Sequence, residues 1–344
     1  MRLISIVIVN WNGRRFLEKC LGSIETQSFK DFEVVFVDNG SIDDSLDFVR
    51  ENFSDTIIVK NEENLGFADG NNRGIRVATG DFILTLNNDT ELKADFLERL
   101  VEAVESSDKD VGMWAPKILS MDDKETIDSV GGLLLYPDGL AKGRGRGELD
   151  RGQYDATADE NRFIPSACAA LYRKEMLNEI GLFDEEFFAY CEDTDLGLRA
   201  RLQGWKTRSA NKAQLYHAYS GTSGRYSPFK AYLVERNRLW VAVKNLPLSM
   251  LLLSPAYTFW RYIVQSYGVI SGKGAGGRFL EGEGSSALGL LSILVKSYLS
   301  VLRGLPGMLR KRRQIQRARK VSTAELRAWF KEETLTAAEL VLKD

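Results

Sequence analysis

The chain has 344 residues, of which 44% are hydrophobic and 27% are charged, so it is long enough for one large core plus an appendage. Its formal net charge of -2 argues against a general nucleic-acid-binding protein. The three cysteines are widely spaced and form no Cys-x-x-Cys pair, so we expect neither a disulfide framework nor a zinc site. Residues 3–9 are apolar but too short for an export segment, and we expect a cytosolic catalytic face.

The amino-terminal third alternates apolar runs of strand length with segments of helical spacing. We expect strands at residues 3–9, 32–37, 56–59 and 82–86, each separated from the next by a helix. Strand-helix-strand units of this length are parallel and right-handed, so the pattern predicts a mostly parallel, doubly wound α/β sheet. Only Gly13 follows the first strand where a dinucleotide fold needs three glycines, and this disfavours NAD binding.

Polar side chains stand where three of these strands end. Asp38 suits a nucleobase or ribose, because a carboxylate accepts hydrogen bonds from ring N–H and hydroxyl groups. Asn87, Asn88 and Asp89 follow the fourth strand, and their oxygens could hold a hard divalent cation such as Mg²⁺ or Mn²⁺. The alternative is a turn in which these residues cap a helix beginning near Lys93.

Four ordered segments resemble glycosyltransferase family 2, and in particular its rhamnosyltransferase-like branch. They read SIVIVNWNG at 5–13, VDNGSIDDS at 37–45, NLGFADGNN at 64–72 and LNNDT at 86–90. The resemblance covers about residues 3–245, and four motifs in order are far more specific than any one. It implies a GT-A nucleotide-sugar-binding fold and an inverting transfer from a nucleotide sugar.

The resemblance also implies roles for individual residues. Asp38 matches the residue that reads the nucleobase, and Asn87 and Asp89 match the ends of the DXD motif, which contacts the ribose and the metal-bound diphosphate. The expected nucleotide-sugar contacts are Asn10, Asp38, Asn64, Gly66, Asn87, Asn88 and Arg236. Asp89 and His217 are the expected ligands of a divalent cation. Since Asn87 stands where many members have an aspartate, we expect weaker metal binding.

Three acids, Glu192, Asp193 and Asp195, stand at the start of a predicted helix. Acids there interact well with the helix dipole, which gives them a purely structural explanation. Aromatic neighbours would, however, desolvate a carboxylate and raise its pKa, as a general base requires. The segment resembles the family's Glu-Asp-x-Asp-Leu motif, whose second acid is the base. We therefore assign Asp193 as the catalytic base and Glu192 as the second candidate.

Two single residues and one loop have two interpretations each. His217, ahead of Ser220 and Gly221, resembles the family's late histidine, although a lone histidine is usually an ordinary core or surface residue. Arg236 could contact the diphosphate or the acceptor, or lie on a helix face. Residues 138–157 are rich in glycine and arginine, and they predict either a flap over the diphosphate or a solvated loop.

The composition changes after residue 244, so we expect a catalytic domain at 1–244 and a C-terminal helical extension at 245–344. The apolar stretches 246–260 and 287–295 are too short to span a bilayer. Residues 310–320 are basic without any acid, which together with apolar faces predicts helices lying on an anionic membrane surface. An oligomer interface is the alternative. Residues 322–325 resemble a capping box for a last helix through Leu342.

The sequence thus predicts an inverting glycosyltransferase at the cytoplasmic face of a membrane. The favoured donor is dTDP-rhamnose, and the acceptor is a glycan or a polyprenyl-diphosphate-linked sugar. One alternative is a nucleotidyltransferase that forms nucleotide sugars, but no glycine-rich phosphate loop follows the first strand. A second is a non-catalytic carbohydrate-binding scaffold, and the intact Asp89 and Asp193 argue against it. We expect no nucleic-acid partner.

Overall fold

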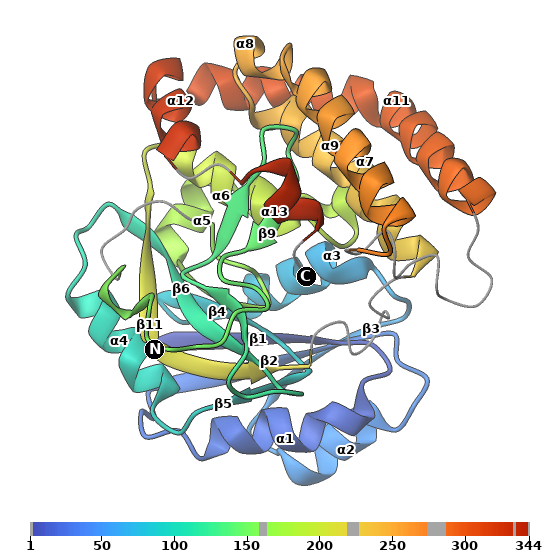
Figure 1. Cartoon of the computed structure of the whole chain (residues 1–344). Coiled ribbons are helices and arrows are strands. Elements are labelled where there is room, and N and C mark those ends of the chain that lie inside the picture. The colour runs from blue at the N-terminus through green and yellow to red at the C-terminus, as the bar shows by residue number, and fades with distance from the viewer. Residues whose placement is uncertain (1–2, 158–163, 219–226, 274–286, 333–334, 343–344) are drawn as a thin grey trace. The chain divides into compact units, whose positions relative to one another are not determined.

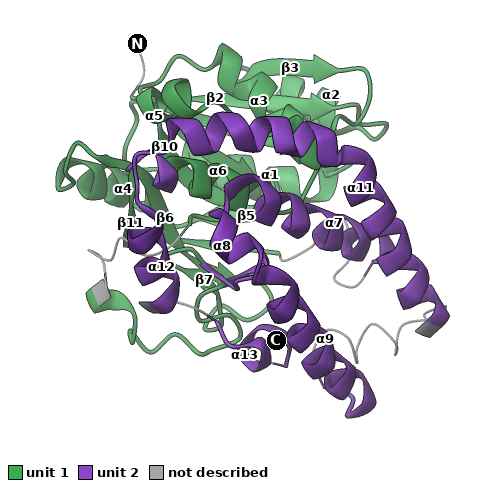
Figure 2. Cartoon of the chain, turned by 90° about the horizontal axis from the view of Figure 1, so that it is seen from above, with its two compact units in different colours: residues 1–133, 143–200, 205–222 green, residues 134–142, 201–204, 223–344 purple. Residues whose placement is uncertain are grey.

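A computed structural model describes residues 3–157, 164–218, 227–273, 287–332 and 335–342. The chain divides into two compact units (Figure 2). Unit 1 consists of residues 1–133, 143–200 and 205–222, and unit 2 consists of residues 134–142, 201–204 and 223–344. The predicted catalytic-domain boundary at residue 244 stays a prediction.

Unit 1 is built on a nine-stranded sheet in which the strand order is β3-β2-β1-β4-β10-β6-β11-β5, with β7 paired to β6. The strands are β1 (Ile4–Asn10), β2 (Phe32–Asn39), β3 (Ile57–Asn61), β4 (Phe82–Asn87), β5 (Thr90–Leu92), β6 (Val111–Ser120), β7 (Ile127–Val130), β10 (Ala169–Arg173) and β11 (Lys206–His217). The first four strands are parallel, as the sequence predicts, and β10 lies antiparallel between β4 and β6. A separate two-stranded sheet pairs β8 (Leu133–Leu135) with β9 (Ala141–Gly143).

Helices cover both faces of this sheet (Figure 1). One core joins the sheet to α1 (Arg14–Glu25), α2 (Ser45–Asn52) and α4 (Phe96–Glu105). The other core joins it to α3 (Gly66–Val77), α5 (Lys174–Ile180) and α6 (Glu192–Leu202). Alternation along β1 explains the division, because Ile6 and Ile8 enter the first core and Val7 enters the second. Two short 3₁₀ helices, η1 (Asp155–Thr157) and η2 (Glu185–Phe187), complete the described part of this unit.

Unit 2 is mainly helical. Its helices are α7 (Pro228–Asn245), α8 (Leu248–Leu251), α9 (Ser254–Ile270), α11 (Ala287–Ala318), α12 (Thr323–Glu332) and α13 (Ala337–Val341). Helices α7 and α11 run in the same direction, since Tyr232 Oη donates to Ser300 Oγ at 3.0 Å and Arg312 Nη1, farther along, donates to Val243 O at 2.7 Å.

The tail differs from the sequence-based prediction in two places. Helix α11 is 32 residues long. It continues through Lys296, directly after the end of the predicted apolar stretch 287–295, and it includes Pro306. Within the part of the chain that the structure describes, residues 288–318 form one helix that is long and apolar enough to cross a membrane, by length and composition alone. The predicted capping box at Ser322 and Glu325 is present, but α12 ends at Glu332 and a separate helix follows.

Four buried charges hold unit 2 together from the inside. Arg261 Nε lies 2.7 Å from Asp138 Oδ2, and Arg261 Nη2 lies 3.2 Å from Glu235 Oε2. Arg238 pairs with the same two carboxylates. The four residues are between 0% and 7% exposed. Two positive and two negative charges balance, so no net charge is buried, and removing one partner would leave the others uncompensated.

We expect Glu235→Gln to lower the free energy of unfolding by about 3–5 kcal/mol at neutral pH, because it leaves two buried arginines short of a carboxylate. Burial alone would raise the pKa of Glu235, but the hydrogen bond and charge of Arg238 and the charge of Arg261 lower it to about 2. A lowered pKa stabilises the fold above the unfolded value, about 4.5, and this contribution is lost as the pH falls toward about 2.

Denaturant unfolding of both proteins across this pH range measures the effect. The difference between native chain and variant should be largest at neutral pH and should shrink below pH 4.5. The exposed Glu105→Gln serves as the control and should change stability by less than about 0.5 kcal/mol. A difference that does not depend on pH would contradict the ionic pairing.

Candidate active site at the carboxyl edge of the sheet

The ends of β1, β2 and β4 bring the predicted donor-binding residues to one edge of the sheet. These strands are parallel neighbours, and the register pairs Asn10 with Asp38 and Val9 with Asn87. The chain then continues through Asn88 and Asp89 directly into β5. The alternative that these residues cap a helix is therefore wrong, because a strand follows them and α4 begins only at Phe96.

Asn10, Asp38 and Asn88 are buried at this edge. Asn88 Nδ2 donates to Asn10 Oδ1 at 2.6 Å. Gly13 permits this approach, because a Cβ there would lie 2.1 Å from Asn88 Nδ2. Asp38 is 1% exposed, and its Oδ1 accepts no hydrogen bond from the residues that the structure describes. A buried oxygen without a donor fits a ligand that supplies an N–H or O–H group.

The side chain of Asn39, at the end of β2, holds the loop that carries Asn64 and Gly66. Asn39 Nδ2 donates to Asn64 Oδ1 and to Gly66 O, each at 3.0 Å. Its Oδ1 accepts from Asn61 Nδ2 at 3.0 Å and from the Leu65 N–H at 3.3 Å. Asn64 Oδ1 also accepts from the Gly66 N–H at 2.9 Å. Asn64 thus shapes its own loop, and its contact with a donor stays a prediction.

A constrained loop precedes α6. Gly66 has φ +83°, and a Cβ on it would lie 2.5 Å from Phe188 O, which accepts the Ala68 N–H at 3.1 Å. Three non-glycine residues of this loop have φ between 65° and 69°: Phe188, Tyr190 and Cys191. Positive φ is strained for such residues and persists where surrounding contacts enforce it. The loop therefore fixes where α6 and its acids begin.

Glu192 and Asp193 begin α6 in different environments. Glu192 is buried, and its Oε2 accepts no hydrogen bond from the described residues. Burial, followed by the charge of Asp193, raises the pKa of Glu192 well above its ordinary value. Asp193 is half-buried, and it accepts from the Ala167 N–H at 3.3 Å and from the Thr194 N–H at 2.6 Å. Burial raises the pKa of Asp193 as well, but these hydrogen bonds oppose the shift.

These environments separate the charges of the pair. The pKa of both carboxyls is raised, but that of Glu192 is raised well above its ordinary value whereas hydrogen bonds oppose the shift of Asp193, so Asp193 ionises more readily than Glu192. The third acid, Asp195, is fully buried and accepts from Arg199 Nε at 2.9 Å, so it is engaged within α6. Of the three acids, Asp193 best combines a negative charge with access to solvent.

Asp89 and His217 lie together on the other side of the site. Strand β11 pairs with β5, and the Ala218 N–H donates to Asp89 O at 2.9 Å. His217 Nε2 then lies 3.4 Å from Asp89 Oδ1, and His217 Nδ1 lies 2.7 Å from Asp128 Oδ2. Burial alone would lower the pKa of His217, but Cys168, Asp128 and Asp89 outweigh it and raise that pKa well above its ordinary value. The surroundings therefore favour a positive charge here, which a proton on His217 supplies and which a cation bound to neutral His217 would replace.

These residues fit a divalent cation. Asn87 Oδ1 is a buried oxygen that accepts no hydrogen bond from the described residues, and the buried Asp89 Oδ1 has the 3.4 Å contact with His217 Nε2 but no hydrogen bond of good geometry. The contact between His217 Nδ1 and a carboxylate is the arrangement that orients metal-bound histidines. The described residues contain no group of three or more His, Cys, Asp or Glu side chains able to hold a metal by themselves. A cation here would thus need further oxygens from water or a diphosphate.

Two adjacent residues join the halves of the site. The Ala167 N–H donates to Asp193 Oδ2 at 3.3 Å, and Cys168 O accepts the Asn87 N–H at 2.8 Å. The Cys168 thiol lies beside His217. Cys168 directly precedes β10, which runs antiparallel to β4, so it lies next to the end of β4. The predicted base and the predicted cation ligands are therefore held against one dipeptide.

Sequence reasoning missed three residues of this region. Asp128, which contacts His217 and lies 2.6 Å from Arg146 Nη2, belongs to no motif. Cys168 was predicted only as one of a run of small residues, 166–170, that leaves room for a sugar, and not as a neighbour of His217. Trp11 lines a hollow of about 450 Å³ and is 43% exposed, and its place directly after Asn10 was the available signal.

Arg236, Ser220, Gly221 and the glycine-rich loop are the other predicted features. Arg236 is on α7 in unit 2, where it stacks on Trp240 with 4.3 Å between the guanidinium carbon and the ring centroid. Its predicted contact with the diphosphate stays a prediction. Ser220 and Gly221 lie outside the described residues. In the glycine-rich loop, Arg146 pairs with Asp128 and Arg144 lies over Tyr154.

Known proteins resemble this chain in sequence. The sequence profile of Glycosyl transferase family 2 matches residues 5–181, just over half of the chain. The chain belongs to this family. Among its relatives, the uncharacterized glycosyltransferase EpsJ of Bacillus subtilis is 25% identical over 237 residues, which cover 68% of this chain and 66% of EpsJ. A PGL/p-HBAD biosynthesis glycosyltransferase of Mycobacterium bovis is 38% identical over 102 residues, 28% of this chain and 40% of that protein.

Solved structures of similar fold are known. TarS of S. aureus, residues 1–349, has a TM-score of 0.54 and 18% identity, covering 98% of this chain and 90% of that one. The mannosyltransferase PcManGT of Pyrobaculum calidifontis, in complex with GDP-Man and Mn²⁺, has a TM-score of 0.52 and 16% identity, covering 92% and 86%. The predicted α/β GT-A fold of family 2 with its C-terminal helices is confirmed. The rhamnosyltransferase-like branch stays a prediction.

We expect Asn39→Asp to destabilise unit 1 by about 1–3 kcal/mol, because the new carboxylate cannot donate to Asn64 Oδ1 or Gly66 O. Urea unfolding measures the change. Asn178→Asp, at an exposed position of α5, is the matched control and should change stability by less than about 0.5 kcal/mol. Equal stability of the two variants would show that the buried amide network contributes little.

Proposed function

We propose that this family 2 chain is an inverting glycosyltransferase that moves a sugar from a nucleoside diphosphate donor to an acceptor hydroxyl. The observation that supports it best is the dipeptide Ala167–Cys168, which holds Asp193 on one side and contacts Asn87 and His217 on the other. A single displacement needs a base and a site for the leaving diphosphate close together.

The donor would bind at the carboxyl edge of the sheet. The unpaired oxygen of Asp38 is available to the nucleobase, and Asn10 and Asn88 are fixed beside it. We favour dTDP-rhamnose as donor, and the support for it is the resemblance of the motifs to the rhamnosyltransferase-like branch. TarS has been solved with UDP-GlcNAc and PcManGT with GDP-Man, so related folds accept different donors. A thermal-shift screen of UDP, dTDP and GDP sugars would identify the base and sugar.

The acceptor hydroxyl would lose its proton to Asp193 Oδ1 or Oδ2 as its oxygen bonds to the anomeric carbon. The bond from that carbon to the diphosphate oxygen breaks at the same time, with inversion, and the diphosphate carries away the electron pair. Burial raises the pKa of Glu192 well above its ordinary value, so Glu192 is less readily ionised than Asp193 and less available as the base. A Mg²⁺ or Mn²⁺ ion held by Asp89, with His217 and the Asn87 oxygen, would neutralise charge on the leaving diphosphate.

The acceptor we favour is a glycan or a polyprenyl-diphosphate-linked sugar in surface polysaccharide synthesis. Unit 2 supports contact with a membrane, because α9 exposes Phe259, Trp260 and Tyr267. Contact between copies of the chain is the alternative use of these side chains. Because the chain spans 66% of EpsJ and 40% of the mycobacterial relative, acceptor and partners are proposals for the protein as a whole.

Two alternatives from other classes are weaker. A nucleotidyltransferase would catalyse attack on a nucleotide phosphorus and needs a glycine-rich phosphate loop after its first strand, whereas Gly13 is the one glycine there. A carbohydrate-binding scaffold would not need two adjacent acids with raised pKa values of which only Asp193 accepts backbone hydrogen bonds from Ala167 and Thr194. Hydrolysis of the donor in the absence of acceptor separates catalysis from binding.

We expect Asp193→Asn to lower the rate of transfer, or of donor hydrolysis, by about 10²–10⁴-fold, because the acceptor would lose its general base. The variant should still bind the donor, as measured by thermal shift. Since burial raises the pKa of Asp193, activity should fall on acidification at a higher pH than an ordinary carboxyl would give. Glu192→Gln should cost less; if it costs as much as Asp193→Asn, the base is not Asp193 alone.

We expect Asp89→Asn to weaken the Mn²⁺-dependent part of nucleotide binding by about tenfold or more, because it removes the one charged oxygen ligand of the site. Thermal shift with UDP, dTDP or GDP in Mn²⁺ and in EDTA measures it. The exposed Asp108→Asn is the control and should behave as the native chain. Nucleotide stabilisation that is the same in EDTA and Mn²⁺ for the native chain would refute the cation assignment.

A further inference from the structure

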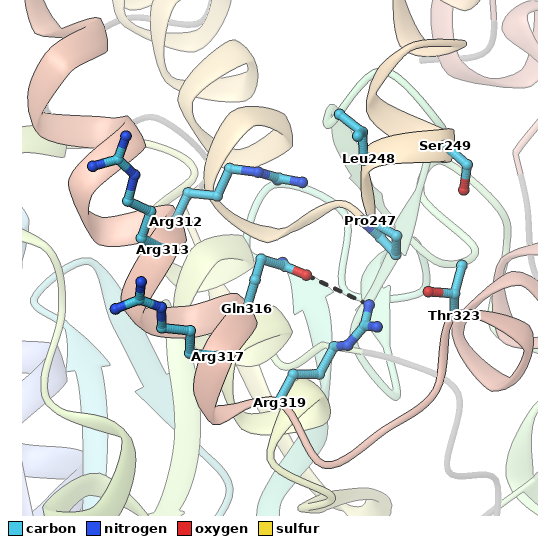
Figure 3. A pocket seen from close by; sticks show the side chains of 9 residues that line it. All are labelled: Pro247, Leu248, Ser249, Arg312, Arg313, Gln316, Arg317, Arg319 and Thr323. Atoms are coloured by element: carbon cyan, nitrogen blue, oxygen red, sulfur yellow. Dashed lines mark hydrogen bonds between the residues drawn. The ribbon is translucent and has the colours of Figure 1, made fainter.

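Unit 2 contains a hollow that the proposed chemistry does not use. It has a volume of about 560 Å³ and lies between the start of α8, the last turns of α11 and the start of α12 (Figure 3). Four arginines line it: Arg312, Arg313, Arg317 and Arg319. No aspartate or glutamate is among its lining residues. The hollow is therefore strongly positive.

Contacts within unit 2 hold two of these guanidinium groups in place without neutralising their charge. Arg312 Nη1 donates to Val243 O at 2.7 Å and to Leu246 O at 2.6 Å, at the end of α7. Arg319 Nη1 donates to Gln316 Oε1 at 3.4 Å, as Figure 3 shows. Burial and then the charge of Arg319 lower the pKa of Arg312, so like charges crowd each other. None of the four arginines pairs with a carboxylate in the described residues.

The residues next to these arginines in the sequence provide no carboxylate to balance the positive charge of the hollow. Residues 310–320 contain seven lysines and arginines and no acid. A guanidinium group offers several N–H donors in a plane and binds phosphate oxygens in pairs. A cluster of such groups around a hollow of this size therefore fits a phosphate group from outside the chain.

Apolar side chains adjoin the hollow. Leu248, which lines it, is 63% exposed, and Leu252 on the following turn is 71% exposed. Exposed residues of α11 recur three, four or seven positions apart and so share one face: Leu288, Leu291, Val295, Leu299, Leu302 and Leu309. Arg313 and Arg317 continue this face toward the end of the helix. An apolar face that leads into a positive hollow matches the boundary between acyl chains and headgroups.

We propose that this hollow binds the phosphate of an anionic phospholipid headgroup, with the apolar face of α11 and the exposed Leu248 and Leu252 against the acyl region. The proposal rests on the membrane contact proposed above and adds a defined phosphate site to it. A second copy of the chain is a poorer occupant, because it would bring the same positive charge to the contact. Free phosphate would leave the adjoining leucines exposed to water.

Sedimentation of the full chain with phosphatidylcholine vesicles, with and without phosphatidylglycerol, tests the proposal. The test variant is Arg313→Gln with Arg317→Gln, and the matched control is Arg303→Gln with Arg310→Gln. Each pair removes two exposed positive charges from α11, but only the first pair lines the hollow. Thermal melting of every variant verifies that it is folded. Donor hydrolysis by the native chain is measured in the same samples.

We expect the test pair to lower partitioning onto phosphatidylglycerol vesicles by at least tenfold more than the control pair, roughly the effect of one phosphate contact. Equal losses would indicate diffuse attraction to the surface and would overturn the site. Inorganic phosphate that stabilises the native chain through the same arginines, without an effect of the variants on vesicle binding, would also overturn it. No vesicle binding with intact donor hydrolysis would reject the lipid site and leave the transferase proposal standing.

Discussion

The candidate site depends on two backbone hydrogen bonds made by neighbouring residues. The Ala167 N–H orients the carboxylate of Asp193, and the Cys168 carbonyl accepts the N–H of Asn87. These contacts exist because β10 enters the sheet antiparallel to β4, so that the chain before β10 meets the end of β4. Groups on α6 and on the loop after β4 are far apart in sequence, yet one rigid dipeptide sets their separation. Transfer chemistry is sensitive to such separations.

The sequence predicted correctly that the ends of three parallel strands lie at one edge of the sheet, and the reason is local. Asn10, Asp38 and Asn87 end strands whose parallel order follows from the alternation of strand and helix, and parallel neighbours end at the same edge. Asp193 was found through a short motif, and the environment that distinguishes it from Glu192 could not be read from that motif. That distinction comes from Ala167, a residue 26 positions away that donates to only one of the two acids.

Other features depend on contacts that no local pattern encodes. Asp128 reaches His217 because β7 pairs with β6 and β6 pairs with β11, and a sequence pattern does not specify such pairings. Asn39 was read as part of a turn motif, but its four hydrogen bonds organise the loop that holds Asn64. The length of α11 was underestimated because counting apolar residues ends at Lys296, whereas packing against α7 continues to Gln316.

The chain passes between the two units several times, so unit 2 is not a tail joined to unit 1 at one point. Residues 134–142 belong to unit 2, where Asp138 pairs with Arg238 and Arg261, while the strand before them carries Asp128 and the loop after them carries Arg146. In a chimera that took only its C-terminal helices from a relative, Asp138 would face that relative's residues in place of Arg238 and Arg261. Substitutions in the hairpin around residue 138 and in the C-terminal helices should therefore be coupled during evolution. A functional chimera of this enzyme would need both segments from the same parent.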